Sequence, residues 1–450
     1  MISGTLKDAA GMMDAQMLGV DARFAGVSTD SRQTRDGELF FALDGPNFDG
    51  HTYVRAALTA GAPAAVVDRE LAVRPLLLTD DTRMALGKLA VRWRTRCAPR
   101  VVAVTGSNGK TTVKEMLASI LAAAGPTLAT SGNLNNDVGL PLTLLQLAPS
   151  HRYAVTELGA NHRGEIAYLT QLAKPDVAVI TNATAAHLEG FGSVTGVAQA
   201  KGEIFLGLAA AGTAVINADD RHISLWRSLA ASFKVLTFGV TADADVHAEL
   251  ADGHLHLTFD EATASVPTTL VGQHNARNAA AACAAALAFD LPLAKIAERL
   301  AQVRPVSGRL QFKTGAGGAV IIDDTYNANP ASLQVALQVL AEQPQPHKYV
   351  LLGDMAELGE QGPQLHEQAG AAVREQGVQL FYAVGELARH AALGFGAGSV
   401  CFDEPSAAAQ ALRGRLTPEV CVLVKGSRAM RMERALALLL DHRAPSAGRG

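Results

Sequence analysis

The sequence has few cysteines, few aromatic residues and little net charge, and each shortage excludes a class of protein. Its four cysteines, Cys97, Cys283, Cys401 and Cys421, form neither a Cys-x-x-Cys pair nor a zinc-binding spacing. All but Cys97 lie in apolar surroundings, so we expect buried free thiols and a reducing compartment. The formal net charge of −4 argues against a general surface for nucleic acid or anionic membranes.

Long apolar runs are also missing. None reaches the roughly 20 residues that a membrane-spanning helix needs, and the longest, residues 279–289, is mostly alanine and suits a packed helix. Residues 1–19 contain charged positions and lack the apolar core of a signal peptide. We therefore expect a cytoplasmic protein that neither enters a membrane nor binds nucleic acid. We also expect a monomer.

The clearest stretch that is present is residues 101–112, Val-Val-Ala-Val-Thr-Gly-Ser-Asn-Gly-Lys-Thr-Thr. An apolar strand passes into a glycine loop, and residues 113–121 then place apolar side chains at helical spacing. Such a loop presents backbone N–H groups to an anion, and Lys110 adds a charge for β- and γ-phosphates. The Thr111 hydroxyl can take a Mg²⁺ position. The pattern predicts an ATP or GTP phosphate site; the alternative is a glycine turn followed by an exposed lysine.

The length of 450 residues favours about three domains. We expect a small α/β unit over residues 1–98, a central unit over 99–310 and a third unit over 311–450. Strands alternate with helices in the last two, which is typical of parallel sheets with covered faces, and residues 240–270 predict an inserted β-hairpin. The expected strands are residues 39–43, 64–67, 76–79, 101–104, 153–156, 177–180, 213–216, 320–322, 349–352, 381–384 and 420–424.

Polar side chains follow several of the central strands. Glu157, Asn182 and Asn217 come directly after apolar runs, and ligands of open α/β sheets lie at the carboxyl ends of strands. A carboxylate beside a phosphate loop can hold Mg²⁺, which prefers oxygen ligands; a capping or solvated glutamate is the alternative for Glu157. His187 also follows a strand end and could join the site, or be a hydrogen-bonded structural histidine.

Lys201 raises a separate question, because an ammonium group is untenable beside a metal ion. At ~4 Å and an effective dielectric constant of about 20, each unit of like charge costs about 4 kcal/mol, and Mg²⁺ roughly doubles that cost. Lys201 therefore either points away from the crevice or is converted by CO₂ into a carbamate that binds the metal. Both interpretations stay open at the level of sequence.

Five further clusters of polar and charged residues are candidates for ligand contacts, because loops that only connect elements do not require such side chains. Arg309 could neutralise phosphate charge, and Asp324, at a strand end, could accept hydrogen bonds from ribose hydroxyls. Turn-forming residues usually just make turns, which is the alternative for each cluster. The clusters are residues 28–32, 47–51, 274–278, 307–309 and 323–330.

Taken together, these stretches resemble the Mur ligase family over nearly the whole chain. The loop Thr-Gly-x-x-Gly-Lys-Thr-Thr is shorter than the common P-loop, as in Mur ligases and folylpolyglutamate synthases. The resemblance implies an α/β protein with a central P-loop ATPase parallel sheet, flanked by a small N-terminal α/β domain and a C-terminal Rossmann-like domain. The other matching stretches are residues 28–32, 47–51, 132–136, 139–143, 157–161, 187–193, 201–205, 272–278, 324–330, 353–359 and 425–428.

The resemblance also implies roles for particular residues. ATP would be bound by Gly106, Ser107, Asn108, Gly109, Lys110, Thr111, Thr112, Asn275, Asn278, Arg309 and Asp324. One Mg²⁺ would lie at Thr111 and Glu157 and a second at His187 and a carbamylated Lys201, and Lys110, His187 and Lys201 would be catalytic. The UDP-sugar-peptide would contact Thr29, Asp30, Ser31, Arg32, Asn47, Phe48, Asp49, Asn133, Asn135 and Asn136, and the incoming dipeptide would lie near Lys425 and Ser427.

The family activity most similar to this pattern is the ATP-dependent addition of D-alanyl-D-alanine to UDP-N-acetylmuramoyl-tripeptide in the cytoplasmic synthesis of peptidoglycan precursors. The resemblance implies an acyl-phosphate intermediate, with the three domains binding the UDP-sugar, ATP and the amine in turn. Related ligases that add a diamino acid carry Asp-Asn-Pro-Arg, whereas the nearest string here is Asp-Glu-Pro-Ser at 403–406. The rivals are another amide ligase of the folylpolyglutamate synthase type and a nucleotide-driven switch, although the guanine-reading Asn-Lys-x-Asp is absent.

Overall fold

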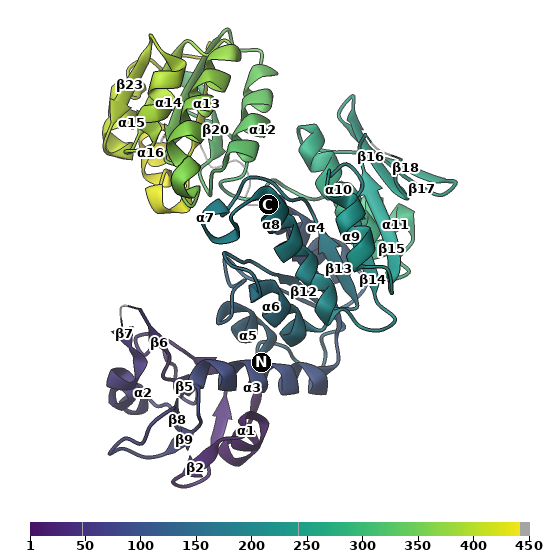
Figure 1. Cartoon of the computed structure of the whole chain (residues 1–450), viewed down its shortest axis with the longest axis vertical. Helices are drawn as coiled ribbons and strands as arrows, with labels where there is room; N and C mark the ends of the chain where they lie inside the picture. Colours follow the sequence, from purple (N-terminus) through teal and green to yellow (C-terminus); the bar gives the residue numbers. More distant parts are fainter. Residues whose placement is uncertain (47, 242, 442–450) are drawn as a thin grey trace.

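The computed structural model describes residues 1–46, 48–241 and 243–441. Three modules follow one another along the chain, each built on one main β-sheet, and the first and last lie at opposite ends of the molecule (Figure 1). Within the described ranges, no helix combines the length and the apolar character needed to cross a bilayer. The expected α/β architecture is confirmed.

The N-terminal module is a small sheet with helices packed around it. Its elements are β1 (Ser3–Thr5), α1 (Leu6–Met13), β2 (Gln16–Leu18), β3 (Arg23–Ala25), β4 (Val27–Ser28), β5 (Leu39–Phe41), β6 (Asp44–Gly45), β7 (Phe48–Asp49), η1 (Gly50–Tyr53), α2 (Val54–Thr59), β8 (Ala65–Val67), β9 (Leu76–Leu78) and α3 (Thr82–Cys97). The main sheet has the order β2-β9-β8-β5-β4. Asp81 is the N-cap of helix α3, and its side chain accepts hydrogen bonds from the N–H groups of Arg83 and Met84.

The central module is built on a nine-stranded sheet, and the glycine loop follows β10, the third strand in the sheet order. Its strands are β10 (Arg100–Thr105), β11 (Thr127–Ala129), β12 (Tyr153–Glu157), β13 (Val177–Ile180), β14 (Thr213–Asn217), β15 (Lys234–Gly239), β16 (Val246–Ala251), β17 (His254–Phe259) and β18 (Ala262–Pro267). The order is β11-β12-β10-β13-β14-β15-β16-β17-β18, parallel as far as β16 and antiparallel beyond it. The β-hairpin expected within residues 240–270 is confirmed, because β16 and β17 pair antiparallel across a short turn. Strand β18 adds a third antiparallel strand, and all three extend the central sheet.

Helices cover both faces of this central sheet. They are α4 (Lys110–Ala122), α5 (Gly139–Leu144), α6 (Glu165–Ala173), α7 (Leu188–Phe191), α8 (Val194–Gly202), η2 (Glu203–Gly207), α9 (Ile223–Leu229), α10 (Gln273–Leu287) and α11 (Leu293–Leu300). Helix α4 buries Val113, Met116 and Leu117, the positions that the helical spacing indicated. Residues 279–286, mostly alanine, are fully buried on α10, so this helix can lie close against α4 and β16. Helices α5 and α6 pack instead against α3 of the N-terminal module.

The C-terminal module has a six-stranded sheet in the order β19-β20-β24-β21-β22-β23, antiparallel only at β19. Its elements are β19 (Gln311–Thr314), η3 (Ala316–Gly318), β20 (Val320–Asp324), α12 (Pro330–Ala341), β21 (His347–Gly353), η4 (Gly359–Gln361), α13 (Gly362–Glu375), β22 (Leu380–Val384), α14 (Ala388–Phe395), β23 (Ser399–Phe402), α15 (Pro405–Arg413), β24 (Val420–Lys425), η5 (Arg428–Met430) and α16 (Glu433–Leu439). Pro330 occupies the first turn of α12, where its missing N–H would have had no partner in the helix.

The cysteines are all free thiols, as expected, but they are not all buried. Cys97, Cys283 and Cys421 are buried, whereas Cys401 is exposed on β23. The expectation of burial was wrong for Cys401 because its apolar sequence neighbours belong to β23, the edge strand of the sheet, and no further strand among the described residues pairs with β23 on its outer side.

Candidate active site

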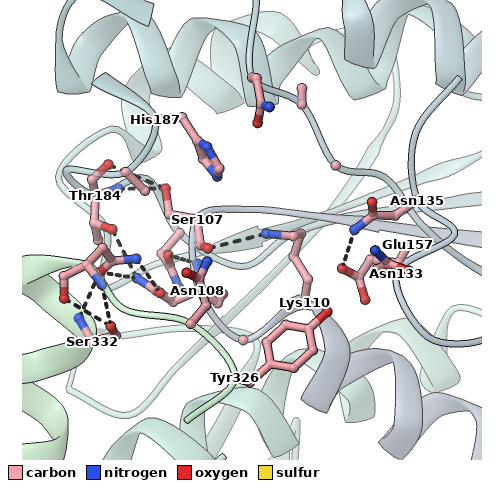
Figure 2. A pocket seen from close by; sticks show the side chains of 18 of the residues that line it. Ser107, Asn108, Lys110, Asn133, Asn135, Glu157, Thr184, His187, Tyr326 and Ser332 are labelled. Atoms are coloured by element: carbon pink, nitrogen blue, oxygen red, sulfur yellow. Dashed lines mark hydrogen bonds between the residues drawn. The ribbon is translucent and has the colours of Figure 1, made fainter. Parts of the chain in front are cut away.

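The glycine loop connects the buried strand β10 to helix α4. Gly106 and Gly109 have φ angles of 146° and 83°, and a Cβ at Gly106 would lie 1.9 Å from the Thr181 hydroxyl. Only glycine fits there, since a side chain would meet both strain and a clash. Lys110 Nζ donates hydrogen bonds to the carbonyl oxygens of Gly106 at 2.7 Å and Ser107 at 3.3 Å. Its ammonium group therefore lies over the loop (Figure 2).

Thr111, at the start of α4, meets Glu157 at the end of the neighbouring strand β12. Thr111 Oγ1 donates to Glu157 Oε2 at 2.9 Å, and Asn135 Nδ2 donates to the other carboxylate oxygen at 2.9 Å. Arg309 Nη2 donates to Thr111 Oγ1 at 2.9 Å. Desolvation lowers the pKa of Lys110; the charge of Glu157 opposes this shift and that of Arg309 adds to it. A hydroxyl and a carboxylate this close offer the hard oxygen ligands that suit Mg²⁺.

His187 and Lys201 both lie near the ring of Phe191. Lys201 Nζ is 5.4 Å from the centre of that ring, and the His187 ring meets it edge-on with centres 6.5 Å apart. The Lys201 side chain is buried, and desolvation followed by repulsion from Lys110 lowers its pKa to about 7. His187 Nδ1 lies within ion-pair distance of the Glu357 carboxylate. Lys201 is thus a buried, partly neutral amine rather than a solvated ammonium group.

One cavity of about 1110 Å³, bordered by all three modules, collects most of the residues that the sequence singled out. Figure 2 shows Ser107, Lys110, Glu157 and His187 around it. Gly106, Thr111 and Lys201 do not line its wall. The lining includes Ser107, Asn108, Gly109, Lys110, Thr112, Asn133, Asn135, Asn136, Glu157, His187, Asn275, Asn278, Arg309, Asp324, Lys425 and Ser427.

Lys425 and Asp324 are partners of each other. They lie side by side in register on the parallel strands β24 and β20, and Lys425 Nζ contacts Asp324 Oδ2 and donates to the carbonyl of Asn327 at 2.9 Å. Both side chains are buried. Among the described atoms, the buried Ser427 hydroxyl has no hydrogen-bond partner, so it is a polar group in the cavity wall that a ligand could satisfy.

The N-terminal residues expected to contact substrate lie outside this cavity. Thr29 to Arg32 form a turn, in which Arg32 pairs with Asp30 at 2.8 Å on the surface. Phe48 is 53% exposed on the β6–β7 hairpin. Asn47 lies outside the described residues. The N-terminal module reaches the cavity instead through Asp81, Arg83 and Met84. These residues follow the expected strand 76–79, but no sequence motif marked them as site residues.

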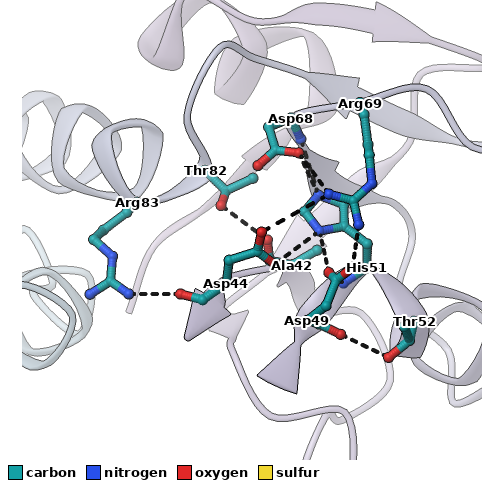
Figure 3. A network of polar contacts seen from close by, with 9 residues as sticks. All are labelled: Ala42, Asp44, Asp49, His51, Thr52, Asp68, Arg69, Thr82 and Arg83. Atoms are coloured by element: carbon teal, nitrogen blue, oxygen red, sulfur yellow. Dashed lines mark hydrogen bonds and ion pairs between the residues drawn. The ribbon is translucent and has the colours of Figure 1, made fainter. Parts of the chain in front are cut away.

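Asp49 belongs to a compact polar network on the β6–β7 hairpin (Figure 3). The buried His51 ring contacts Asp49 at 2.8 Å and Asp68 at 3.0 Å, with Asp44 at 3.4 Å. The guanidinium group of Arg69 contacts the same three carboxylates. Through its contacts with His51 and Arg69, Asp49 therefore has a structural role in the β6–β7 hairpin.

Four other residues at the cavity were not singled out by the sequence analysis. Thr184 and Asn329 hydrogen-bond the Asn108 side chain. Tyr326 stacks on the guanidinium group of Arg309, and Glu357 contacts His187. Three of them lie within the family-matching stretches or polar clusters of the sequence, at 323–330 and 353–359, so a signal is present there. Which polar residues of these stretches reach the site is decided by how the central and C-terminal modules pack against each other.

Comparisons with known proteins agree with this geometry. Residues 23–123 match the model described as Mur ligase family, catalytic domain, residues 104–286 match the Mur ligase middle domain, and residues 308–428 match the Mur ligase, glutamate ligase domain. Fold and site together define an ATP-dependent amide ligase, and the chain belongs to the Mur ligase family.

The similarity extends over nearly the whole chain to one particular ligase of this family. It is 41% identical over 454 residues to the UDP-N-acetylmuramoyl-tripeptide–D-alanyl-D-alanine ligase of Escherichia coli (strain K12), covering 98% of this chain and 99% of the relative. MurF from Acinetobacter baumannii superposes with a TM-score of 0.91 at 36% identity, covering 97% and 98%. MurF from Thermotoga maritima in complex with ADP has a TM-score of 0.83 at 30% identity, covering 92% and 96%. The predicted family, three-domain fold and ligase class are confirmed.

Proposed function

We propose that this chain joins D-alanyl-D-alanine to the terminal carboxylate of UDP-N-acetylmuramoyl-tripeptide, with cleavage of ATP to ADP and phosphate. The observation that carries the proposal is a single cavity in which residues 107–110 of the glycine loop and Glu157 face residues of both outer modules. Thr111 lies behind the cavity wall and hydrogen-bonds Glu157 from there. A nucleotide, a long UDP-linked carboxylate and an amine must meet in one place for this reaction. A cavity shared by three modules suits that need.

The reaction requires an activated carboxylate, because an amine does not displace oxide from a carboxylate. An oxygen of the tripeptide carboxylate attacks the γ-phosphorus of ATP, the bond to the β–γ bridging oxygen breaks, and ADP leaves. Lys110 and the N–H groups of the loop neutralise charge on the transferred phosphoryl group. The amine of the dipeptide then attacks the acyl carbon, phosphate leaves and the nitrogen loses a proton. Closure of the modules would keep water off the acyl phosphate.

We infer two Mg²⁺ positions, one at Thr111 and Glu157 and one at His187 and Lys201. When bound, Mg²⁺ would neutralise negative charge on the phosphates and the acceptor carboxylate. Lys201 would serve as a carbamate, formed when its neutral amine adds to the carbon of CO₂ and loses a proton. A pKa of about 7 makes that neutral amine available near neutral pH.

The remaining assignments are part of the same proposal. The domains would be residues 1–98 for the UDP-sugar, 99–310 for ATP and 311–450 for the amine, in a cytoplasmic monomer. Asn275, Asn278, Arg309 and Asp324 would contact ATP, and Lys425 and Ser427 would lie near the dipeptide. The UDP-sugar-peptide would extend from Asn133, Asn135 and Asn136 toward Thr29, Asp30, Ser31, Arg32, Asn47, Phe48 and Asp49.

The test is an assay of phosphate release from ATP with UDP-N-acetylmuramoyl-tripeptide, with and without D-alanyl-D-alanine. We expect release to depend on the dipeptide, and the product to gain the mass of the dipeptide less water. Release without any amine would favour a nucleotide switch. Glutamate added to a folate with no use of the UDP-sugar would favour the folylpolyglutamate synthase type.

A further inference from the structure

The glycine loop touches the C-terminal module through two asparagine side chains. Asn329 Nδ2 donates to Asn108 Oδ1 at 2.9 Å, and Asn108 Nδ2 lies 3.5 Å from Asn329 Oδ1. Both residues line the cavity, and Asn329 is buried. Since they belong to different modules, the contact exists only while the C-terminal module packs against the loop.

The direction of the Asn329 amide is set by a second role, as the N-cap of α12. Its Oδ1 accepts a hydrogen bond from the Ser332 N–H at 2.9 Å, and Ser332 Oγ accepts one from the Asn329 N–H at 3.0 Å. In this capping box the side-chain oxygen of Asn329 is occupied by its hydrogen bond to the first turn of α12. The amide nitrogen is therefore the atom that faces the glycine loop.

Asn108 is held on its other side by the central sheet. Its Nδ2 donates to Thr184 Oγ1 at 3.0 Å (Figure 2). Its N–H donates to Asn182 Oδ1 at 3.0 Å, and its carbonyl accepts from Thr181 Oγ1 at 2.6 Å. The central module thus positions the backbone at Asn108 and one side of its amide. The hydrogen bond to Asn108 Oδ1 comes from Asn329.

We propose that Asn329 is a positioning residue that couples the placement of the C-terminal module to the shape of the glycine loop. With the module packed as here, Asn329 holds the Asn108 side chain, and the loop keeps the arrangement that presents its N–H groups to the cavity. Nucleotide binding and the packing of the C-terminal module then favour each other, because both depend on the same contact. The inference rests on the proposed ATP-dependent function of this loop.

The test compares Asn329→Ser with Asn329→Ala in the full chain. Serine caps a helix about as well as asparagine but is too short to reach Asn108, whereas alanine loses both roles. We expect both variants to raise the KM for ATP and lower kcat, with kcat/KM falling about three- to tenfold, the size of one net hydrogen bond. Only Asn329→Ala should also lower the Tm of unfolding. The KM for the dipeptide should change little.

Asn108→Ala supplies the matched control, since it removes the partner. Adding Asn329→Ser to Asn108→Ala should cost nothing further in kcat/KM, because the contact is already gone. Wild-type kinetics in Asn329→Ser would overturn the inference, and so would losses that multiply in the double variant. Absence of turnover in the wild type would instead contradict the proposed function, so the two failures are distinguishable.

Discussion

His187 of the central module lies against Glu357 of the C-terminal module, with Nδ1 of the ring within ion-pair distance of the carboxylate. Both residues have left-handed backbone conformations, with φ of 54° and 63°, which are unfavourable for residues other than glycine. The interaction with His187 lowers the pKa of Glu357, and desolvation opposes that shift. The pair is thus a second point, apart from Asn108 and Asn329, at which the two modules meet.

Replacing Glu357 with Gln should loosen this contact at constant size. The two side chains are 23% and 48% exposed, so we expect the free energy of unfolding to fall by less than about 1 kcal/mol. Amide hydrogen exchange should nevertheless quicken over residues 187–192 and 355–361, where the modules touch. Mass spectrometry measures this exchange. Glu360→Gln, an exposed neighbour on η4, is the control, and an equal change in both variants would contradict the role of the pair.

Lys110→Ala should abolish turnover while leaving the fold in place. The substitution removes the positive charge over the loop and its hydrogen bonds to two loop carbonyls. Loss of one group that stabilises a transition state costs about a hundred- to a thousandfold in rate. Phosphate release and thermal unfolding measure the two effects separately. Lys295→Ala, at a side chain 75% exposed, should behave as wild type. Full activity of Lys110→Ala would refute the assigned role.

Glu157→Gln should weaken the binding of a divalent cation. Glutamine keeps the shape of the side chain but loses the charge that faces Thr111. We expect the affinity for Mn²⁺, a paramagnetic substitute for Mg²⁺, to fall at least about tenfold. Electron paramagnetic resonance of free Mn²⁺ reports this without any turnover. The exposed Glu298→Gln, with its side chain 57% accessible, is the control, and an unchanged Mn²⁺ affinity in Glu157→Gln would remove that residue from the metal site.

Lys201→Met should stabilise the protein most at low pH. The pKa of Lys201 falls from 10.5 to about 7 on folding, so between these values the unfolded chain binds a proton that the native state lacks. Native stability therefore rises with pH across this window, and the cost of the buried amine is fully present below pH 7. That cost is roughly 5 kcal/mol.

Urea unfolding of wild type and Lys201→Met, in buffers free of CO₂, measures this difference. The gain from methionine should be largest at about pH 6 and small by about pH 10. Bicarbonate should reduce the gain if the native amine is stabilised as a carbamate. The exposed Lys295→Met controls for the loss of a surface charge. A gain that does not vary with pH would show that the Lys201 amine titrates normally.

Local patterns in the sequence determined the individual helices and the glycine loop of this protein. The spacing of Val113, Met116 and Leu117 predicted the buried face of α4, and the alanine run predicted the buried helix α10. The glycine loop could be located because only glycine tolerates φ of 146° at position 106 against a neighbouring hydroxyl. Elements of this kind are set by residues a few positions apart, so a single sequence contains their signal.

Only the tertiary structure decided which polar side chains meet. It paired Asn108 with Asn329 and Lys425 with Asp324, and it left Arg32 outside the cavity while bringing Arg83 to its edge. It also made residues 246–267 part of the central sheet and exposed Cys401 at the edge of another. These outcomes depend on how separate modules and strands pack, and contacts between residues hundreds of positions apart have no periodicity or turn chemistry that marks them in the chain.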